Sequence, residues 1–446
     1  MMKIAVIGLG YVGLPLALQF ARSGVKVLGL DVDSAKVVAL NQGRSYIAHI
    51  PAEAVKRARG HGTGAEEMLE ASVDFARVRE VEAVIICVPT PLTEHREPDI
   101  SYILKTGETI ARYLQPGSLV VLESTTYPGT TDEDLRRVLE AGSVRARRGG
   151  KGSARQMKAG VDFYLAYSPE REDPGNPSSR VADIPKVVGG YTPECLARAT
   201  ALYSKAIKTI VPVSSCRAAE ATKLLENIFR SVNIALVNEL KLVYGAMGID
   251  IWEVIAAART KPFGYMPFYP GPGLGGHCIP IDPFYLTWKA REYGQHTRFI
   301  ELAGEINTSM PQHVVSRVAE ALNHHRKPIA GSLILILGLA YKADVDDLRE
   351  SPTFVLMRLL EARGAKVDYF DPHIPVIGRT REHAKYAGKK SVRWSRQSLA
   401  KYDAVLISTA HRSVNYQELA DWAKVIVDTR NAMAAVRAKR DQVWKA

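Results

Sequence analysis

The chain has 446 residues and a formal net charge of +12, from 59 lysines and arginines against 47 acidic residues. Hydrophobic residues make up 46% of it and charged residues 24%, a composition that excludes a disordered or fibrous chain and is typical of a globular protein. The length exceeds what one hydrophobic core usually supports, so two or three domains are expected. The sequence contains no run of about 18 apolar residues, so no membrane helix is predicted.

The first residues and the cysteines predict the compartment. Residues 1–7 lead directly into a strand-like pattern without the features of a signal peptide, so a cytoplasmic protein is expected. Cys87, Cys195, Cys216 and Cys278 are scattered along the chain, without the paired spacing of a zinc site or a disulfide framework. Reduced thiols and no metal are therefore predicted.

A dinucleotide-binding pattern opens the chain. Residues 3–7 resemble a strand and run into Gly8-Leu9-Gly10-Tyr11-Val12-Gly13, an apolar helical stretch at 14–20 and a second strand at 25–30 that ends at Asp31. The glycines allow a pyrophosphate to approach the helix N-terminus, and the acid can accept hydrogen bonds from the adenosine ribose, which favours NAD over NADP. Lys36, in the next helix, could reach the same ribose or be an ordinary solvated lysine.

The pattern of buried strands continues at 83–88, 118–122 and 163–167, with a helix expected at 101–114 and Cys87 in the core. The loops after these strands carry Pro89, Thr90, Thr125 and Glu170. Because ligands bind at the carboxyl ends of strands in an open α/β sheet, Thr90, Thr125 and Glu170 are predicted to face one crevice. Each alone could also be a cap or turn residue.

A basic stretch follows and accounts for much of the positive excess. It contains Arg145, Arg147, Arg148, Lys151, Arg155 and Lys158, interleaved with Gly and Ser. This composition predicts a mobile, solvated insertion rather than a folded groove for a polyanion.

Residues 214–258 read as one long helix with little interruption, which is more than a usual domain helix and predicts an element that spans between domains and supplies a dimer face. Glu220, Lys223 and Asn227 lie on one face of it. An exposed Glu–Lys pair is the simplest alternative. Because Lys223 and Asn227 are embedded among apolar residues, a polar stripe on a buried helix is favoured.

A glycine- and proline-rich loop at 270–283 contains Gly275-Gly276-His277-Cys278, with Asp282 four residues after the cysteine. Such a backbone can pass close to a ligand, and the two glycines leave the sulfur unshielded, as a thiol nucleophile requires. A tight surface turn is the open alternative. A second α/β domain follows, with strands at 333–338, 367–370, 404–408 and 425–427 and a helix capped by Ser351 and Pro352 that runs through Glu361.

Together these motifs resemble the nucleotide-sugar 6-dehydrogenase family of UDP-glucose, UDP-N-acetylglucosamine, UDP-N-acetylmannosamine and GDP-mannose dehydrogenases. The resemblance covers nearly the whole chain. It rests on the glycine turn, Glu123-Ser124-Thr125, Ser168-Pro169-Glu170-Arg171, the Lys223/Asn227 helix, the loop from Phe268 and Tyr269 to Asp282, and Tyr341-Lys342 with Arg349-Glu350-Ser351. The loops at 168–176 and 267–283 look most like the bacterial UDP-N-acetylglucosamine branch.

The fold that this resemblance implies is α/β, with two Rossmann-like doubly wound domains joined by a long central helix in an α-helical dimerisation domain. The expected domains are an NAD-binding domain at 1–212, a central domain with the cysteine loop at 213–325 and a UDP-sugar-binding domain at 326–446. The implied partners are a UDP-sugar and a second copy of the chain, without nucleic acid or membrane.

The resemblance also implies roles for individual residues. The residues expected to be catalytic are Cys278, Lys223, Asp282, Glu170 and Asn227. Cofactor contacts fall on the Gly8–Gly13 turn with Tyr11 and Val12, and on Asp31, Lys36, Pro89, Thr90, Thr125 and Arg349. Substrate contacts fall on Glu170, Arg171, Lys223, Asn227, Phe268, Tyr269, Gly271, Gly275, Lys342 and Arg430, and on Arg259 reaching across the dimer, with Lys261 as the alternative.

The expected chemistry is two successive oxidations of a primary alcohol with two NAD⁺. Cys278 would form a thiohemiacetal and then a thioester, Lys223 would stabilise oxyanions, and Asp282 would act as base through a water that Glu170 helps to orient. A β-hydroxyacid-type dehydrogenase and a non-catalytic NAD-binding module are the alternatives. Neither would need Lys223, Cys278 and Asp282 together.

Overall fold

The computed structural model describes residues 2–47, 50–60, 66–93, 97–145, 155–172, 180–276, 279–378, 380 and 383–446. The chain forms two compact units, one of Met1–Glu226 with Phe284–His296, the other of Asn227–Pro283 with Thr297–Ala446. No helix among the described residues is long and apolar enough to cross a membrane.

The first unit is built on an eight-stranded sheet in the order β10-β9-β8-β5-β4-β1-β2-β3. Neighbouring strands are parallel except for the antiparallel pair β8 and β9. The segment from β3 to β8 has the strand order of a dinucleotide-binding domain, which reverses between β1 and β4. The strands are β1 (Lys3–Ile7), β2 (Lys26–Leu30), β3 (Leu69–Ser72), β4 (Ala83–Ile86), β5 (Leu119–Leu122), β8 (Tyr164–Tyr167), β9 (Lys186–Gly190) and β10 (Ile210–Val213).

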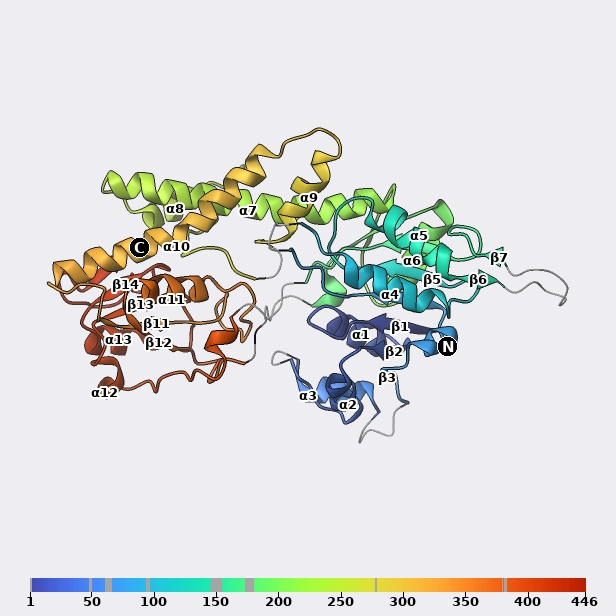
Figure 1. Cartoon of the computed structure of the whole chain (residues 1–446), viewed down its shortest axis with the longest axis horizontal. Coiled ribbons are helices and arrows are strands. Elements are labelled where there is room, and N and C mark those ends of the chain that lie inside the picture. The colour runs from blue at the N-terminus through green and yellow to red at the C-terminus, as the bar shows by residue number, and fades with distance from the viewer. Residues whose placement is uncertain are drawn as a thin grey trace. The chain divides into compact units, whose positions relative to one another are not determined.

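Both faces of this sheet are buried. Ile4 and Val6 of β1 belong to one apolar cluster, while Ala5 and Ile7 belong to the other, because successive side chains of a strand point to opposite faces. The covering elements (Figure 1) are α1 (Gly13–Arg22), α2 (Ser34–Asn41), α3 (Ala52–Ala58), α4 (Ser101–Ala111), α5 (Arg136–Gly142) and α6 (Pro193–Tyr203), with short helices at Phe75–Glu80, Thr130–Leu135 and Val181–Asp183. The expected strands and helices of this part are confirmed within a few residues, whereas β3, β9, β10 and α6 were not predicted.

Part of the basic stretch lies among the described residues. A two-stranded ribbon pairs β6 (Val144–Arg145) with β7 (Arg155–Gln156), and Arg147, Arg148 and Lys151 lie outside the described residues. Arg155 forms an ion pair of 2.7 Å with Asp162, and Lys158 lies 3.5 Å from Glu140. These two cations therefore carry partners, which corrects the expectation of a purely solvated loop for this part of it.

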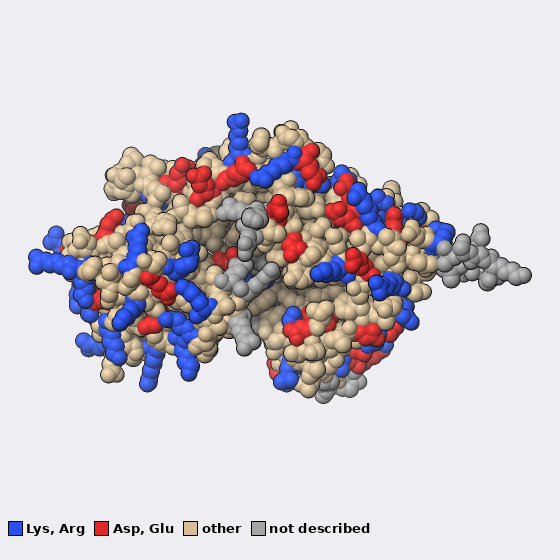
Figure 2. Space-filling model, in the orientation of Figure 1, with Lys and Arg blue, Asp and Glu red and all other residues tan. Residues whose placement is uncertain are grey.

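The second unit contains a parallel five-stranded sheet in the order β12-β11-β13-β14-β15. This order, like that of the first sheet, reverses beside the first strand, which makes the domain doubly wound. Its elements are β11 (Leu333–Leu337), α11 (Pro352–Ala362), β12 (Lys366–Phe370), a short helix Ala384–Tyr386, α12 (Arg396–Leu399), β13 (Ala404–Ile407), α13 (Tyr416–Trp422), β14 (Ile426–Asp428) and β15 (Val443–Lys445). Most of the excess positive charge of the chain lies in residues 326–446, and Figure 2 shows many lysines and arginines over this domain.

The long helix is shorter than the sequence predicted. It runs as α7 (Cys216–Ala246), and a separate α8 (Ile251–Ala258) follows. Gly248 adopts φ +74°, and Ile249 N–H donates to Tyr244 O while Gly248 N–H donates to Gly245 O, which is a glycine-terminated helix end. Asp250 then caps α8 through Trp252 N–H. The expectation of one helix to residue 258 was wrong because this stop-and-restart signal was read as tolerated glycines.

The remaining helices of the chain are α9 (Asp282–Arg291) and α10 (Arg298–His324). Within the second unit, α10 packs against α7, as the bonds between their side chains described below establish (Figure 1). Ser351 caps α11 by accepting a hydrogen bond from Thr353 N–H, with Pro352 at the first helical position, as predicted.

Candidate active site

The glycine turn after β1 forms a cradle with one open position. A Cβ on Gly8 (φ +89°) would lie 2.5 Å from Cys87 O, and a Cβ on Gly13 would lie 1.9 Å from Gly8 O. A Cβ on Gly10 would meet nothing within 4 Å. The chain itself therefore requires the first and third glycines, whereas Gly10 borders the open space into which a dinucleotide pyrophosphate fits.

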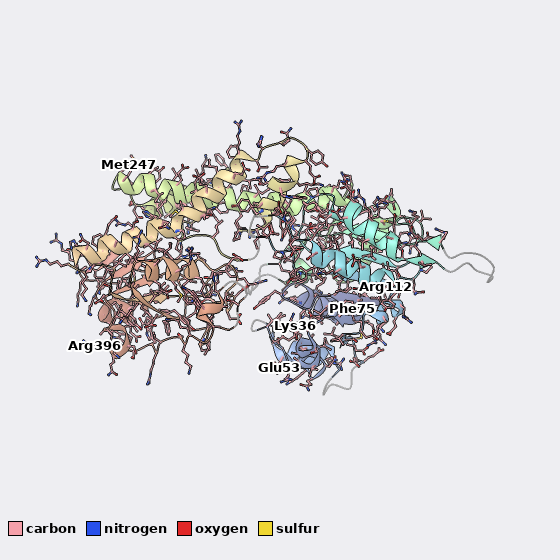
Figure 3. All side chains as sticks on the ribbon, viewed as in Figure 1. Lys36, Glu53, Phe75, Arg112, Met247 and Arg396 are labelled. Carbon is pink, nitrogen blue, oxygen red and sulfur yellow. The ribbon has the colours of Figure 1, made fainter. Side chains whose placement is uncertain are left out.

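Asp31, after β2, joins that turn to the next helix. Its Oδ2 accepts a hydrogen bond of 2.8 Å from Leu9 N–H, and its Oδ1 accepts one of 2.9 Å from Asp33 N–H. Lys36 Nζ lies 3.4 Å from Asp31 Oδ2, and Figure 3 labels this lysine on α2. The carboxylate is thus fixed beside the cradle, at the position where a ribose is bound in this fold, and the residues present fit NAD.

The loops after β4 and β5 are bonded to each other. Thr90 Oγ1 donates to Thr125 O at 2.7 Å, and Ser124 Oγ donates to Val88 O at 2.7 Å. The structure therefore brings Thr90 and Thr125 together at one edge of the sheet, with Pro89 exposed beside them. Glu123 is the first residue of the Glu123-Ser124-Thr125 motif. Its carboxylate points inward and pairs with Lys186 of β9 at 2.8 Å, so it holds β9 and does not line the edge of the sheet.

Lys223 of α7 reaches the loop that follows β8. Its ammonium donates to the backbone oxygen of Glu170 and lies 3.5 Å from Glu170 Oε2, and the residue is 5% exposed. Burial raises the pKa of the nearby Glu172 carboxyl to about 8, and the charge of Glu170 adds to this rise. Lys223 and Glu170, which were both predicted as site residues, are therefore in contact, and the lysine is buried.

Arg171, in the same loop, lies against the next turn of α7. Its Nη2 pairs with Glu226 Oε1 at 2.7 Å, and its Nη1 donates to Pro185 O at 2.7 Å. These bonds fix the backbone around Glu170. Whether Arg171 contacts a substrate stays a prediction.

The polar stripe predicted on α7 is buried. Glu220 is fully enclosed and accepts hydrogen bonds from Gly129 N–H at 2.7 Å, Thr131 N–H at 2.9 Å and Thr131 Oγ1 at 2.7 Å. Burial raises the pKa of its carboxyl to about 8, although these three donors oppose the rise. The alternative of an exposed Glu220–Lys223 pair fails because neither side chain is exposed.

The same stripe continues into the second unit. Asn227 Nδ2 donates to Asp282 Oδ2 at 2.7 Å, and both residues are buried. Asp282 is the first residue of α9, where the helix dipole favours a carboxylate. The structure thus brings together two residues that are 55 positions apart and that the sequence assigned to one site.

His277 and Cys278 lie outside the described residues, but the glycines before them pack tightly on the second sheet domain. A Cβ on Gly275 would lie 2.7 Å from Tyr341 Cβ, and one on Gly276 would lie 2.8 Å from the Tyr341 ring. Gly276 N–H donates to Arg349 O at 3.1 Å. Close backbone packing thus explains these glycines.

The start of the same loop is packed as closely. A Cβ on Gly271 would lie 2.6 Å from Arg430 Nη1, and Arg430 Nε donates to Ser408 O at 2.8 Å. Burial lowers the pKa of the Arg430 guanidinium to about 10, so it stays protonated at neutral pH. The predicted substrate residues Gly271 and Arg430 are therefore neighbours.

The aromatic residues before the loop are braced by helices. Phe268 meets Phe229 edge to face at 5.6 Å, and Tyr269 stacks on Trp252 at 5.8 Å. Arg259 ends α8 and is exposed, as is Lys261, and the contact of either residue across a dimer stays a prediction.

The loop that carries Lys342 and Arg349 repeats the architecture of the glycine turn. Gly338 (φ +86°) follows β11 and donates to Phe370 O, as Gly8 donates to Leu30 O. Asp371 Oδ2 accepts from Leu339 N–H at 2.7 Å and from Ala340 N–H at 3.0 Å, as Asp31 accepts from Leu9. Each sheet therefore presents a loop tied to an aspartate after the second strand.

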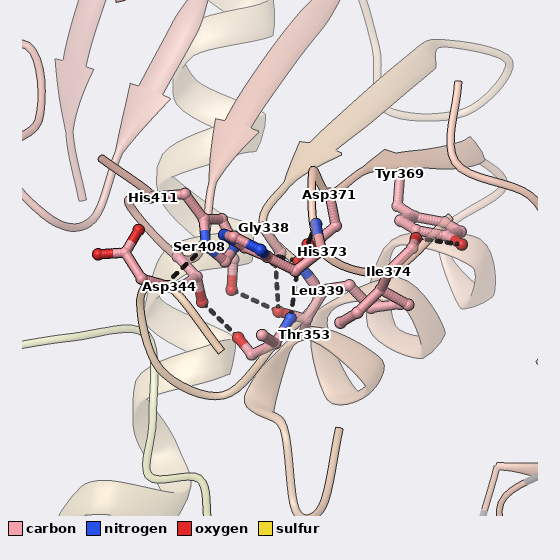
Figure 4. A network of polar contacts seen from close by, with 12 residues as sticks. Gly338, Leu339, Asp344, Thr353, Tyr369, Asp371, His373, Ile374, Ser408 and His411 are labelled. Carbon is pink, nitrogen blue, oxygen red and sulfur yellow. Dashed lines mark hydrogen bonds and ion pairs between the residues drawn. The ribbon is translucent and has the colours of Figure 1, made fainter. Parts of the chain in front are cut away.

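His411 braces this second loop, as the dashed lines of Figure 4 show. Its Nδ1 accepts from Asp344 N–H at 3.0 Å, so the proton lies on Nε2, which is 3.0 Å from Asp371 Oδ2. Although burial opposes it, the bond from His411 and two backbone N–H groups hold the pKa of Asp371 below its ordinary value. Asp344, His373 and His411 lie close enough together to hold a cation, but both nitrogens of His411 are already bonded, and a hydrogen-bond network explains the cluster.

Lys342 is half-buried in this loop, and Arg349 donates to Asp347 at 2.6 Å. The cofactor contact expected of Arg349 stays a prediction. Sequence reasoning gave no site role to Glu226, Tyr341, Asn238 or Asn307. For Asn238 the signal was present, since it lies three helical turns from Asn227 on the same face of α7.

Three domain models of the UDP-glucose/GDP-mannose dehydrogenase family match the chain. The NAD binding domain matches residues 2–207, the central domain 217–309 and the UDP binding domain 335–435. A UDP-N-acetyl-D-glucosamine 6-dehydrogenase of Pseudomonas aeruginosa is 36% identical over 92% of this chain and 90% of its own length. An NDP-N-acetyl-D-galactosaminuronic acid dehydrogenase of Ralstonia solanacearum is 32% identical over 97% of both chains.

Solved structures of dehydrogenases are similar to this chain over nearly its whole length. The UDP-D-ManNAc dehydrogenase of Pyrococcus horikoshii superposes with a TM-score of 0.86 at 32% identity, covering 100% of this chain and 99% of that one. A UDP-glucose dehydrogenase of Pyrobaculum islandicum superposes with a TM-score of 0.82 at 26% identity, covering 100% and 98%.

Proposed function

This chain belongs to the UDP-glucose/GDP-mannose dehydrogenase family, and we propose that it oxidises the C6 hydroxymethyl group of a UDP-sugar to the carboxylate with two NAD⁺. UDP-N-acetylglucosamine is the first candidate substrate, and the uronic acid would serve as a precursor of surface polysaccharide. The cofactor is NAD, since the family's NAD binding domain spans residues 2–207. The positively charged C-terminal domain suits an anionic diphosphate.

One observation carries this proposal. Lys223 and Asn227 lie one turn apart on α7, both are buried, and each is bonded to a further residue of the predicted site, Lys223 to Glu170 and Asn227 to Asp282. Polar groups are seldom buried unless they are bonded, and a buried lysine and a buried asparagine on one helix face, each bonded to a residue that carries a carboxyl group, support a reaction centre.

The chain's own residues would perform the chemistry as follows. NAD, when bound in the cradle at Gly10 and Asp31, supplies the hydride acceptor for both oxidations. Cys278 would add its thiolate to the C6 aldehyde to form a thiohemiacetal, and the second oxidation would leave a thioester. Asp282 would take a proton from the water that hydrolyses the thioester, and Glu170 would help to orient that water. Lys223 would stabilise the oxyanion at C6 and favour the thiolate.

The proposed contacts divide among the nucleotide end of the substrate, its sugar and NAD. Lys342, Arg430 and Gly271 would bind the nucleotide end, together with Phe268, Tyr269 and Gly275. Arg171 and Asn227 would contact the sugar side, and Pro89, Thr90, Thr125 and Arg349 would contact NAD. We assign residues 1–212 to the NAD-binding domain, 213–325 to the central domain and 326–446 to the UDP-sugar-binding domain. The family models support this division.

The named relatives support three further sugars. UDP-N-acetylmannosamine and UDP-glucose are alternatives, from the Pyrococcus and Pyrobaculum proteins, and an N-acetylgalactosamine derivative is suggested by the Ralstonia protein. Assaying purified protein with a panel of these UDP-sugars tests the choice.

The number of NADH formed per sugar tests the reaction class. Two NADH per sugar supports the proposal, one supports a β-hydroxyacid-type dehydrogenase, and none supports an NAD-binding module. Cys278→Ser should abolish uronic acid formation while NAD binding persists, because the thioester requires sulfur. Near wild-type formation of uronic acid by this variant would refute the thioester mechanism.

We also propose a homodimer formed through the central helix. Apolar side chains follow one another along α7 at spacings of four and seven residues and are about half exposed or more: Leu225, Phe229, Leu236, Val243 and, just beyond the helix, Met247. Figure 3 labels Met247 at this end of the helix. Such a stripe on a single chain suits a second copy. Sedimentation should give a dimer for the wild type and a monomer for Leu236→Glu. A wild-type monomer at micromolar concentration would refute the proposal.

A further inference from the structure

Beyond Asn227 the buried face of α7 carries a chain of amide hydrogen bonds. Asn238 is 0% exposed and Asn307, on α10, is 3% exposed. Asn238 Nδ2 donates to Asn307 Oδ1 at 2.9 Å, and Asn307 Nδ2 donates to Ser231 O at 3.1 Å. Both members of this pair lie in the second unit, between two packed helices.

The chain of bonds ends on the cysteine loop. Gly271 N–H donates to Asn238 Oδ1 at 3.0 Å, and the other side of Gly271 lies against Arg430, as shown above. The start of the loop is therefore held between an amide of α7 and the guanidinium expected to bind the nucleotide. Two fully buried amides are costly unless each group is bonded, and here each amide both donates and accepts.

Resting on the proposed function, we propose that Asn238 and Asn307 are positioning residues for substrate binding. Asn238 fixes Gly271 and thereby the place of Arg430, and Asn307 fixes the orientation of the Asn238 amide. Asn307 and Gly271 together set the orientation of that amide, because Asn307 Oδ1 accepts from Asn238 Nδ2 and Asn238 Oδ1 accepts from Gly271 N–H. If the side-chain amide of Asn238 were flipped, its Nδ2–H group would face the Gly271 N–H instead of an oxygen.

Replacing the amide NH2 of Asn238 by a carboxyl oxygen tests its hydrogen bonds without changing the packing. Asn238→Asp keeps the size and an acceptor for Gly271 N–H. When its carboxyl is protonated, the O–H can donate to Asn307 Oδ1 as the amide did. When it is ionised, that bond is lost and two oxygens face each other. Burial favours the protonated form at low pH, so the effect should grow as pH rises.

The test is the dissociation constant of UDP, measured by calorimetry from pH 5.5 to pH 8.5. The ratio of the Asn238→Asp constant to the wild-type constant should rise about tenfold across this range, the effect of losing one buried hydrogen bond. Asn307→Asp keeps the bond to Asn238 and loses only the one to Ser231 O, so its ratio should change less. Asn323→Asp, at the exposed end of α10, is the matched control and should give a constant ratio.

The charged groups packed in this region are Lys241 on α7, His313 and Arg317 on α10, Asp428 at the end of β14 and Arg430 just after it. The wild type and the variants all carry these groups, so their own effect on UDP binding cancels in the ratio. A ratio for Asn238→Asp that stays flat would overturn the inference. So would equal changes in the two asparagine variants, and if Asn238→Asp does not fold, an unchanged UDP constant in Asn307→Leu would do the same. Failure of the wild type to bind UDP would instead refute the proposed function.

Discussion

Asn227 donates a hydrogen bond of 2.7 Å to Asp282, and both side chains are buried. The bond ties the middle of α7 to the first residue of α9, so an amide donor sits where a second carboxylate would fit. Asn227→Asp should therefore create two carboxyl groups that share a proton, with one pKa raised. If Asp282 must be ionised to act as base, kcat at pH 7 should fall at least about tenfold and recover partly as pH rises.

The measurement for Asn227→Asp is a pH profile of kcat. Asn233→Asp is the matched control, because Asn233 lies on the same helix and its amide donates only to its own helix, at Phe229 O. The control should keep the wild-type profile. A profile of Asn227→Asp that coincides with the wild type would show that Asp282 is not the base.

Gly10→Ala should separate cofactor binding from folding. Because an added Cβ meets no protein atom within 4 Å and φ is not positive there, stability should stay within about 1 kcal/mol of the wild type. The methyl group would fill the cradle, so the KM for NAD should rise at least about tenfold. Gly245→Ala, at an equally open position on α7, is the control for both measurements.

Gly8→Ala provides a second comparison with Gly10→Ala. Its Cβ would lie 2.5 Å from Cys87 O in a left-handed backbone, so the melting temperature should fall. Normal NAD kinetics in Gly10→Ala would mean that the dinucleotide does not pass over this turn.

Much of the fold could be predicted because many of its helices, strands and turns are specified by residues that are close together in the sequence. The strand, glycine turn and acid at 3–31 each follow from nearby residues, and so do Ser351 and Pro352 at the start of α11. The break after α7 was also local, but Gly248 and Asp250 had to be read together as a stop and a restart. Helical spacing placed Glu220, Lys223 and Asn227 on one face, and their burial confirmed that face.

Partners distant in sequence could not be predicted in the same way. Asn238 bonds with Asn307, 69 residues away, and nothing in either neighbourhood indicates that the two helices face each other there. Arg430 meets Gly271 through the packing of β14 on the loop, which no local pattern encodes. Such contacts follow from tertiary packing and not from propensity.

Glu220 should make the stability of the protein depend on pH. Burial raises the pKa of its carboxyl to about 8 from an ordinary value of 4.5. Because the folded pKa lies above the unfolded one, its contribution to the free energy of unfolding is complete below pH 4.5 and is lost as pH rises toward 8. Glu220→Gln cannot titrate, so the difference in stability between wild type and variant should shrink from pH 5 to pH 8.

Urea unfolding of both proteins at several pH values measures this difference. Both carboxyl oxygens accept N–H bonds, so the amide nitrogen of Glu220→Gln loses one of them, and this cost is the same at every pH. A difference that does not change with pH would mean that the three donors from Gly129 and Thr131 keep the carboxylate ionised in spite of its burial.

Lys223 provides the strongest test of the reaction centre. Its ammonium is buried and bonded to Glu170, so the residue is not a surface lysine whose loss would be neutral. Loss of an oxyanion stabiliser typically costs about 10²–10³ in kcat, and Lys223→Ala should lower kcat by at least about a hundredfold. UDP affinity and folding should change little, and the pH at which iodoacetamide alkylates Cys278 should rise, because a cation that favours the thiolate is gone. Lys208→Ala, which removes an exposed lysine paired with Asp183, is the matched control and should leave both measurements unchanged. Normal turnover with an unmoved alkylation profile in Lys223→Ala would limit this lysine to holding the Glu170 loop.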